Sequence, residues 1–556
     1  MNLNIRVSGP AWMWINSSAE ILWGIFAFLW YDVLSDLEYE SRIKWWVNWY
    51  DINISDKNAI ISKYVDVFLA FSVDSVVKSK DYLKSWSVVF LNKKYLDSLS
   101  EDLKNELVQK NIKFFDLEIN DKYDNTYLLP LACKYLWVWF DVLDDKIKEI
   151  FLKKSEVVYL ANKKIIENIF NNVQVETSNI NLEKIWTPKQ YSYWNKQVTY
   201  WAIEWELEFY SAYPMTPASS ILTEVVNSKK VNFLQAEDEI ASINAALWAS
   251  YTTSRAMVWT SGWGFALMTE ALSFAIQAEL PITVALSMRA WPSTWTPTYF
   301  EQWDLNYALN PTFWDFEHIV LYPSSVVECY EFWALALSLA DKFQTVVILL
   351  LDKQLSELFN SFENNPKVYV DRGEIIKNPP LDYKRYENTL SWISPRVKVW
   401  TISWDFISTS YEHDEFWATS EDAENKIKMT QKRWRKLNDF YKNIPHKGYE
   451  VINPEAKKMF ISMSANCYNL KAFVENNPEY GLIIIKILKP INPEILEVIK
   501  NLEEIIFVES NFSGQLESYI TKEFGLKYQN NLKISNFRKY DWFPFYYEEI
   551  DEKFSK

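Results

Sequence analysis

VNFLQAEDEIASINAALWASYTTSRAMVWTSGWGFALMTEALSFAIQAELPITVALSM, residues 231–288, is the stretch that decides the fold. It alternates three apolar, strand-like runs with two helix-like segments. The strands are predicted at Val231–Gln235, Arg255–Thr260 and Ile282–Met288, and the helices at Asp238–Tyr251 and Phe265–Gln277. Strands that alternate with helices are typical of a mainly parallel sheet with helices on both faces. The predicted fold class is therefore α/β, with mainly parallel, doubly wound sheets.

The same alternation extends towards both ends of the chain and divides it into blocks. A polar stretch, Asn171–Asn181, separates the first block from the second and has the composition of a linker. We expect three α/β domains joined by a linker and by an irregular connecting segment. The domains are predicted at 1–175, 194–378 and 451–556, the linker at 176–193 and the irregular segment at 379–450.

Composition and charge exclude several classes of function. The chain has 556 residues and a net charge of −15, and it carries no lysine or arginine stripe, so nucleic acid is not expected as a partner. Its longest apolar runs, such as Ile21–Tyr31 and Val346–Leu351, fall short of the ~20 residues of a membrane span. The N-terminus opens as a strand and not as a signal segment. The expected location is the cytoplasm, without membrane association.

Metal and redox sites are not expected within the chain itself. Its three cysteines, Cys133, Cys329 and Cys467, are far apart and form no CxxC motif. This spacing argues against an iron–sulfur cluster and against a disulfide framework, and it favours buried apolar cysteines. The three histidines do not cluster either, and Trp303-Asp304-Leu305 only approaches a diphosphate–magnesium motif.

Glycine is the anomaly of the composition. A chain of this length holds about 39 glycines at the usual frequency, but this one holds 9, together with 28 tryptophans. The two counts together come close to the expected glycine number. We interpret most of the tryptophans as glycines: the source reads UGA as glycine, and the printed sequence reads UGA as tryptophan.

The positions of the tryptophans favour the same interpretation. Trp263 lies between Gly262 and Gly264, and Trp30 follows a predicted helix at the place where glycine is favoured. Further examples are Trp12, Trp14 and the pair Trp45-Trp46. Individual exceptions are expected, Trp49 first among them. The alternative is a real tryptophan-rich binding module that recognises carbohydrate or a membrane interface.

Three segments of the middle block could carry chemistry, because ligands bind at the carboxyl ends of strands in open α/β sheets. The first is Tyr213-Pro214-Met215-Thr216-Pro217. Thr216 as the N-cap of a helix, with Pro217 in its first turn, is sufficient as a local structural explanation. A helix N-terminus with a free hydroxyl also attracts a carboxylate or a phosphate. Both interpretations stay open.

The second segment carries three carboxylates, and the third carries an arginine. Glu237, Asp238 and Glu239 begin a helix, where carboxylates suit the helix dipole. A thiamine cofactor, however, needs one carboxylate against its aminopyrimidine ring. Arg289 follows an apolar strand, where it could hold the carboxylate of a 2-oxoacid in bidentate fashion or form a surface salt bridge.

Once tryptophan is taken as glycine, ordered motifs along nearly the whole chain resemble the fused γ–α subunit of 2-oxoacid:ferredoxin oxidoreductases, the 2-oxoglutarate type in particular. Met215 is a departure, because the family usually has isoleucine there. The matching motifs are Ser8–Trp14, Ser41–Trp49, Tyr213–Pro217, Glu237–Ser242, Thr260–Phe265, Arg289–Thr298, Ile393–Arg396, Glu412–Glu415, Glu421–Asn425, Glu509–Gln515 and Tyr540–Trp542.

The resemblance implies a fold and a set of roles. It implies a γ-type domain, a thiamine-binding pyrimidine-type domain and a transketolase C-terminal-like domain, in chain order. Thr216 and Arg289 would contact the 2-oxoacid, and Glu239 would be the carboxylate on the aminopyrimidine. Tyr213, Pro214 and Glu237 would lie beside the cofactor.

The resemblance also implies partners and a reaction. A β subunit would hold the diphosphate, Mg²⁺ and a [4Fe–4S] cluster, in an αβ heterodimer or a dimer of heterodimers (a heterotetramer). The reaction would be oxidative decarboxylation of a 2-oxoacid with coenzyme A, giving an acyl-CoA, CO₂ and reduced ferredoxin. The substrate favoured is 2-oxoglutarate, while pyruvate, branched-chain and aryl 2-oxoacids stay open.

Overall fold

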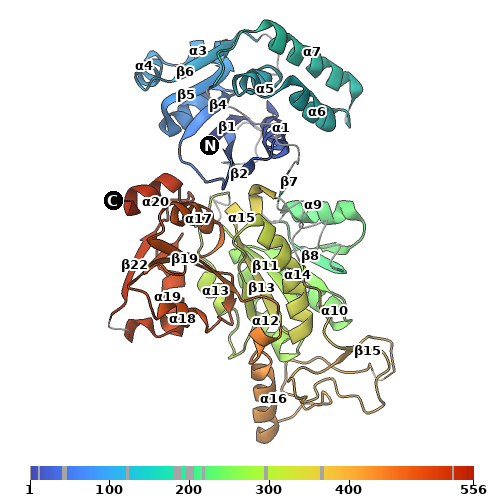
Figure 1. Cartoon of the computed structure of the whole chain (residues 1–556). Coiled ribbons are helices and arrows are strands. Elements are labelled where there is room, and N and C mark those ends of the chain that lie inside the picture. The colour runs from blue at the N-terminus through green and yellow to red at the C-terminus, as the bar shows by residue number, and fades with distance from the viewer. Residues whose placement is uncertain are drawn as a thin grey trace. The chain divides into compact units, whose positions relative to one another are not determined.

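The computed structural model describes most of the chain as two compact units, whose elements are labelled in Figure 1. The first comprises Met1–Tyr193, Leu358–Asn364 and Tyr546–Lys556, and the second comprises Trp194–Glu357 and Asn365–Phe545. The described residues are 2–10, 13–39, 47–119, 124–153, 155–178, 189–193, 206–215, 219–292, 298–362, 368–402, 404–528 and 531–555.

The first unit is built on an eight-stranded sheet in the order β6-β5-β4-β1-β3-β2-β14-β7. Strand β1 pairs in parallel with β4 and antiparallel with β3, so the sheet is mixed. The strands are β1 (Asn2–Pro10), β2 (Asp32–Tyr39), β3 (Val47–Ser55), β4 (Val65–Ala70), β5 (Leu83–Asn92), β6 (Lys113–Leu117), β7 (Gln190–Tyr193) and β14 (Phe359–Phe362).

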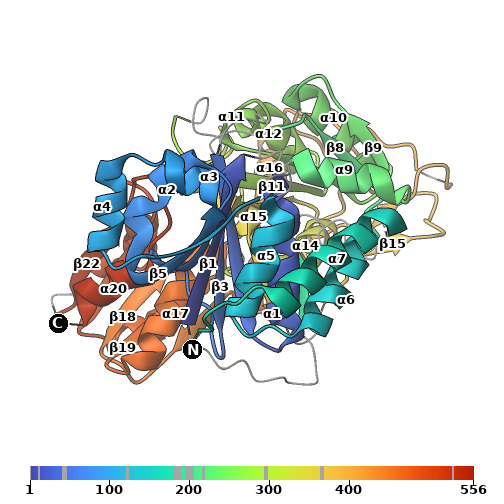
Figure 2. The ribbon, with the colours of Figure 1, turned by 90° about the horizontal axis from the view of Figure 1, so that it is seen from above.

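Helices cover both faces of this sheet, as Figure 2 shows. One apolar core lies beneath α1 (Ile15–Phe28), α5 (Asp124–Tyr135), α6 (Phe140–Phe151) and α7 (Glu156–Asn172). A second core lies on the opposite face with α2 (Val73–Ser79), α3 (Lys93–Ser98) and α4 (Glu101–Gln109). The C-terminal helix α20 (Tyr547–Phe554) joins this unit, because Tyr547 N donates to Ile61 O at 3.0 Å and Ser62 Oγ donates to Glu548 at 2.6 Å.

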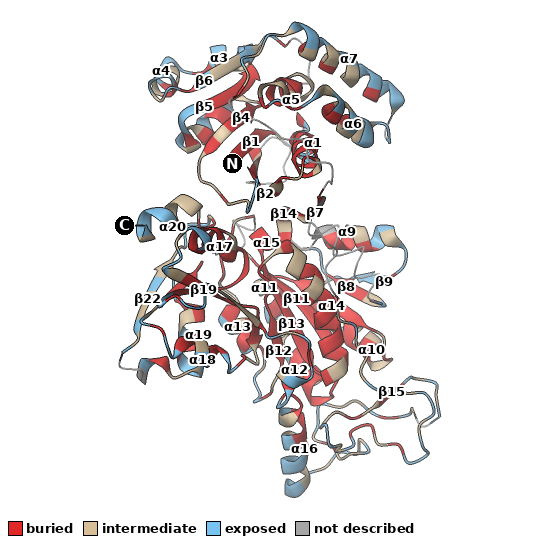
Figure 3. Cartoon of the chain, in the orientation of Figure 1, coloured by how far each residue is buried: buried red, intermediate tan, exposed pale blue. Residues whose placement is uncertain are grey.

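The second unit contains a seven-stranded sheet in the order β20-β12-β13-β11-β10-β8-β9. Its strands are β8 (Phe209–Ala212), β9 (Asn232–Gln235), β10 (Ala256–Thr260), β11 (Ile282–Met288), β12 (Ile319–Leu321), β13 (Val346–Asp352) and β20 (Ile487–Lys489). The pairings are parallel except for that of β20. Every residue of β11 and β13 is buried, which explains their unbroken apolar sequences (Figure 3).

Seven helices accompany this sheet among the described residues. They are α9 (Ser219–Ser228), α10 (Glu239–Tyr251), α11 (Gly262–Ala266), α12 (Thr269–Gln277), α13 (Leu305–Leu309), α14 (Val326–Phe343) and α15 (Lys353–Glu357). The predicted single helix Phe265–Gln277 is therefore wrong in detail. Leu267 N donates to Gly264 O, and Met268 N donates to Phe265 O. These hydrogen bonds span three residues, as in a 3₁₀ turn, and they end α11 before α12 begins.

A five-stranded sheet in the order β17-β19-β18-β21-β22 completes the second unit. Its elements are β17 (Tyr449–Ile452), β18 (Lys458–Ser462), β19 (Tyr480–Ile485), β21 (Glu504–Glu509), β22 (Lys533–Arg538), α17 (Cys467–Asn476), α18 (Ile495–Ile499) and α19 (Gln515–Glu523). Between the two sheets the described chain forms the short strands β15 (Ile375–Ile376) and β16 (Arg396–Val397), the helix α16 (Ala423–Arg435) and a 3₁₀ turn at Phe440–Lys442. The prediction of an α/β fold with mainly parallel sheets is confirmed.

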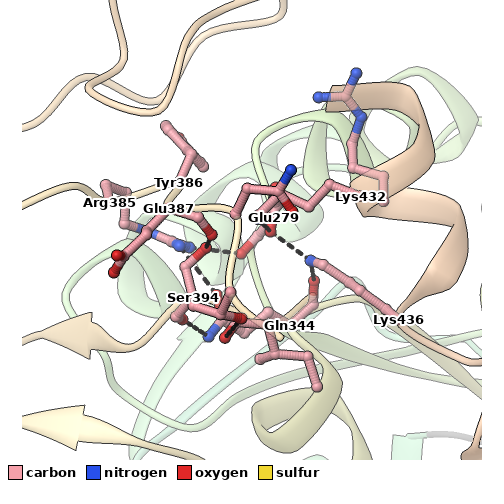
Figure 4. Close-up of polar contacts among 12 residues, drawn as sticks. Glu279, Gln344, Arg385, Tyr386, Glu387, Ser394, Lys432 and Lys436 are labelled. Atoms are coloured by element: carbon pink, nitrogen blue, oxygen red, sulfur yellow. Dashed lines mark hydrogen bonds and ion pairs between the residues drawn. The ribbon is translucent and has the colours of Figure 1, made fainter. Parts of the chain in front are cut away.

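A buried cluster of charged side chains connects α16 to the domain of the seven-stranded sheet. Glu279, fully buried at the end of α12, accepts hydrogen bonds from Lys432 Nζ at 2.7 Å and from Lys436 Nζ at 2.5 Å (Figure 4). Arg385 Nη2 donates to Glu279 O at 2.8 Å. Burial alone would raise the pKa of Glu279, but the charges of Lys432, Lys436 and Arg385 lower it well below its usual value.

We expect Glu279→Gln to lower the free energy of unfolding by about 3–5 kcal/mol, because it leaves two buried ammonium groups without their counter-charge. Urea unfolding at neutral pH measures this loss. The control is Asp439→Asn, which breaks the exposed pair with Lys442 and should cost no more than about 1 kcal/mol. Equal losses in the two variants would contradict the prediction.

Tryptophans occupy an unusual share of the left-handed backbone conformations. Eight of the sixteen described non-glycine residues with positive φ are tryptophans: Trp14, Trp30, Trp86, Trp137, Trp392, Trp400, Trp417 and Trp542. A bulky residue rarely adopts this conformation. Trp30 follows the C-cap of α1 and has φ 72°.

Two of these tryptophans lie in Schellman turns, the helix ends that favour glycine. After α1, Trp30 N donates to Ala27 O and Tyr31 N donates to Phe26 O. After α5, Trp137 N donates to Lys134 O and Val138 N donates to Cys133 O. A genuine glycine, Gly525, holds the corresponding place after α19 with φ 59°. The backbone at Trp30 and Trp137 therefore has the same left-handed conformation as the backbone at Gly525.

Candidate functional site

A cavity of about 320 Å³ lies at the carboxyl ends of the central strands in the seven-stranded sheet, where a ligand is expected in such a fold. The residues that line it follow β10 and β11 or precede α13. They are Gly262, Trp263, Ala266, Arg289, Ala290, Trp291, Trp303 and Asp304. The rings of Trp263 and Trp291 stack at 6.1 Å.

Glu239 is the first residue of α10, directly after the N-cap. The Asp238 carboxylate accepts from Ala241 N at 2.7 Å and so satisfies the helix end. This leaves Glu239 itself without a capping role. Its side chain is 5% exposed, and Oε1 has no hydrogen-bond partner among the described residues. A buried carboxylate oxygen without a donor is costly, so this atom is suited to receive a donor from a ligand.

Gly264 explains how this carboxylate fits beneath the turn after β10. A Cβ on Gly264 would lie 2.5 Å from Glu239 Oε1 and 2.2 Å from Thr260 Oγ1. Any side chain at this position would therefore displace Glu239. The turn Ser261-Gly262-Trp263-Gly264 and the first turn of α10 form one packed arrangement around the carboxylate.

Arg289 and Asp304 form the charged wall of the cavity. Arg289 follows the last residue of β11, and Asp304 is the N-cap residue of α13. A Cβ on Gly262 would lie 2.5 Å from both carboxylate oxygens of Asp304, so this side chain packs directly on the turn after β10. Burial raises the pKa of Asp304 to about 6, although the positive charge of Arg289 acts in the opposite direction.

The other predicted site residues have mixed positions. Thr216 lies outside the described residues. Tyr213 and Pro214 follow β8, and Tyr213 is 40% exposed. The Ser261 hydroxyl donates to the sulfur of Met215, which brings this segment to the turn after β10. Glu237 is exposed to solvent, and no described contact joins it to the cavity.

Asp304 is the residue that sequence reasoning missed. In the sequence, Trp303-Asp304-Leu305 resembles only an incomplete magnesium motif. The structure instead places this carboxylate beside Gly262, in a cavity that Arg289 also lines. An acidic residue between apolar neighbours was the available signal, but its burial depends on packing between segments far apart in the sequence.

Metal and membrane sites do not appear in the described part of the chain. Its histidines, cysteines and carboxylates include no group of three that could hold a metal ion. The three cysteines are buried, and burial raises the pKa of each thiol, to about 12 for Cys467. None of the described helices combines the length and the apolar character that crossing a bilayer requires.

The middle of the chain matches a known protein family. Residues 201–432 match the family model described as "Pyruvate flavodoxin/ferredoxin oxidoreductase, thiamine diP-bdg". The segment covers β8 to β13, including Glu239, Arg289 and Asp304. The cavity described above therefore lies inside a domain type that binds thiamine diphosphate.

Relatives extend the likeness to the whole chain. The alpha subunit of 2-oxoacid:ferredoxin oxidoreductase 2 from Aeropyrum pernix is 34% identical over 319 residues, which are 55% of this chain and 49% of that protein. The alpha subunit of 2-oxoacid:ferredoxin oxidoreductase from Saccharolobus solfataricus is 27% identical over 95% of this chain and 94% of its own length.

A solved structure agrees with these relatives. The 2-oxoglutarate:ferredoxin oxidoreductase from Magnetococcus marinus, described with 2-oxoglutarate, coenzyme A and succinyl-CoA bound, has a TM-score of 0.89 and 25% identity. The match covers 100% of this chain and 99% of that one. The chain is therefore similar over nearly its whole length to the alpha subunits of 2-oxoacid:ferredoxin oxidoreductases, and its residues 201–432 match a thiamine-diphosphate-binding domain.

Proposed function

We propose that this chain is the alpha subunit of a thiamine-diphosphate-dependent 2-oxoacid:ferredoxin oxidoreductase with 2-oxoglutarate as its substrate. The reaction is oxidative decarboxylation with coenzyme A to an acyl-CoA, CO₂ and reduced ferredoxin. The observation that carries the proposal is the buried Glu239 Oε1, which has no donor among the described residues and lies in a thiamine-binding domain.

The residues present fit the aminopyrimidine end of the cofactor. In this proposal Glu239 Oε1 accepts a hydrogen bond from the ring, which satisfies the carboxylate and favours the ring tautomer that can remove a proton. Thiamine diphosphate, when bound, supplies the C2 carbon that attacks the 2-oxo group and accepts the electrons of decarboxylation. Gly264 keeps space for the Glu239 carboxylate.

Arg289 and Thr216 bind the substrate in this proposal. The Arg289 guanidinium lines the cavity and suits a carboxylate in bidentate geometry. Thr216 supplies a hydroxyl, as its motif implies.

The proposal assigns the remaining chemistry to a β subunit. That partner holds the diphosphate, Mg²⁺ and a [4Fe–4S] cluster and passes electrons to ferredoxin, in an αβ heterodimer or a dimer of heterodimers in the cytoplasm. Its support is the alpha-subunit names of the relatives.

The test of this function is reconstitution with the product of the neighbouring β gene. The complex is assayed with coenzyme A and ferredoxin against 2-oxoglutarate, pyruvate, branched-chain and aryl 2-oxoacids. We expect reduction of ferredoxin with 2-oxoglutarate as the best substrate. A preference for another 2-oxoacid would overturn the substrate, and no turnover with any of them would overturn the activity.

We expect Arg289→Ala to raise KM for the 2-oxoacid by about 10- to 100-fold, because a charge-assisted hydrogen bond to a carboxylate contributes about 1.5–3 kcal/mol. Steady-state kinetics of the complex measures this change. Arg289→Lys keeps the charge but loses the planar pair of donors. Its KM should therefore lie between the values of the wild type and of Arg289→Ala. An unchanged KM in Arg289→Ala would exclude this residue from substrate binding.

We also propose that most tryptophans of the printed sequence are glycines in the native protein, through a code that reads UGA as glycine. The left-handed conformations of eight tryptophans and the two Schellman turns support it. Three further tryptophans, Trp263, Trp291 and Trp303, line the substrate cavity and would restrict it. Sequencing of the coding DNA and peptide mass spectrometry of the native protein decide the question, and UGG codons at these positions would end the proposal.

A further inference from the structure

The wall of the cavity that carries Asp304 is held by the C-terminal sheet. The segment before α13 does not pack only on its own domain. Gln302 N donates to Ser510 O at 2.8 Å, and Ser510 N donates back to Gln302 Oε1 at 3.0 Å. Ser510 follows the last residue of β21. Phe300 N also donates to Trp542 O at 3.2 Å. Segments more than 200 residues apart therefore form one reciprocal pair.

Gln515 holds the backbone on both sides of Asp304. This residue begins α19 and is 6% exposed. Its side-chain amide donates from Nε2 to Trp303 O at 2.8 Å, while Oε1 accepts from Asn306 N at 2.8 Å. One planar amide thus satisfies backbone groups on both sides of Asp304. Such a two-point contact fixes the backbone that carries the Asp304 side chain.

A buried polar network supports this contact from beneath. Asn466 Nδ2 donates to Gln302 Oε1 at 3.1 Å and to Ser510 Oγ at 3.2 Å. Gln302 Nε2 lies 3.2 Å from the Tyr322 hydroxyl, which donates to Asp352 at 2.8 Å. The network joins the carboxyl ends of both sheets of the second unit. Its members are almost fully buried, so the segment they hold has little freedom to move.

We propose that Asp304 and Gln515 are positioning residues for the substrate cavity: Gln515 fixes the segment 303–306, and the carboxylate of Asp304 sets the direction of the Arg289 guanidinium. Three observations support this proposal. The Asp304 carboxylate packs on Gly262, and Asp304 and Arg289 line the same cavity. The Gln515 amide forms hydrogen bonds to the backbone on both sides of Asp304. The proposal rests on the proposed function, because Arg289 must bind the substrate carboxylate.

The electrostatics of Asp304 are consistent with this role. Burial raises the pKa of its carboxyl to about 6, and the charge of Arg289 opposes this shift. Among the described residues, the phenol of Tyr307 on α13 is also coupled to this carboxyl. Above this pKa the carboxylate is ionised and can orient the guanidinium. Below it the attraction is lost, so the affinity for the 2-oxoacid should fall as the pH falls through about 6.

The experiment compares three variants of the full chain in complex with its β subunit. Gln515→Ala removes both contacts, Asp304→Asn removes the charge, and Ser518→Ala is the matched control on the exposed side of the same helix. KM for the 2-oxoacid, kcat and the pH dependence of kcat/KM are measured for each. Hydrogen exchange of the amides of 298–309 is followed in the same samples, without substrate.

We expect Gln515→Ala to raise KM about 10-fold or more, with a smaller change in kcat, and to speed the exchange of the Asn306 amide by a similar factor. Asp304→Asn should raise KM without speeding that exchange, and it should remove the decline of kcat/KM below about pH 6. Ser518→Ala should match the wild type. A stabilising role alone would lower Tm in Gln515→Ala and leave KM unchanged, which would overturn the proposal.

Failure of this inference is distinguishable from failure of the proposed function. If the wild-type complex turns over no 2-oxoacid, the function is wrong, and the exchange data still report whether Gln515 holds the segment. If the wild-type complex is active but Gln515→Ala and Asp304→Asn both keep the wild-type KM, the positioning role is wrong while the function stands.

Discussion

Glu239→Gln is expected to slow exchange of the thiamine C2 proton by about 100- to 10,000-fold in the complex with the β subunit. Glutamine has the same shape, so the packing against Gly264 survives. It cannot, however, support the ring tautomer that removes the proton, because the amide lacks the charge and basicity of the carboxylate. Proton exchange followed by NMR at fixed pH measures the effect directly, without any contribution from the 2-oxoacid or from electron transfer.

The matched control for this variant is Glu270→Gln, which removes the same charge from an exposed position on α12. It should exchange the C2 proton at the wild-type rate. Binding of thiamine diphosphate to each variant is measured in parallel, so that loss of the cofactor is separated from loss of proton transfer. If Glu239→Gln binds the cofactor and exchanges its proton as fast as the control, Glu239 is not the carboxylate on the aminopyrimidine.

The second large effect concerns the tryptophans in left-handed backbone. A non-glycine residue there costs about 1–2 kcal/mol, and the eight sites together approach the ~5–15 kcal/mol that stabilises a typical domain. We therefore expect the chain with glycine at these eight sites to unfold cooperatively, and the printed chain to be insoluble or much less stable. Expression of both versions and denaturant unfolding of the soluble fraction measure the difference.

Alanine variants separate the backbone from the bulk of the indole. Trp30→Gly with Trp137→Gly is compared with Trp30→Ala with Trp137→Ala in the otherwise glycine-restored chain. Both pairs remove the ring, but only glycine removes the cost of a Cβ at positive φ. The glycine pair should be more stable by about 1 kcal/mol per site. Equal stabilities, or a printed chain that folds cooperatively, would contradict the glycine interpretation.

Much of the fold could be predicted because it follows from local alternation. The strands predicted in 231–288 correspond to β9, β10 and β11. The break between α11 and α12 was missed because no proline marks it. The addition of β14 to the sheet of the first unit was equally unpredictable, since pairing with β2 and β7 depends on contacts across most of the chain.

The candidate site also contains some residues that the sequence suggests and others that it does not. Glu239 and Arg289 could be selected as candidates from sequence because each lies next to a strong secondary-structure signal and belongs to a motif. Asp304 and Gln515 could not. Their significance lies in a packed carboxylate and in a side-chain amide that contacts a segment far away in the sequence. Hydrogen bonds of this kind depend on where two sheets meet, which neither periodicity nor capping signals encode.

The order in which the first unit is completed has a consequence for its synthesis. Strand β14 and helix α20 belong to that unit, although they follow most of the chain in the sequence. At a translation rate of about 5–20 residues per second, a nascent chain holds β2 without its β14 neighbour for many seconds. An open strand edge on a ribosome-bound chain invites mispairing. Chaperone capture during translation should therefore concentrate between the emergence of β7 and that of β14.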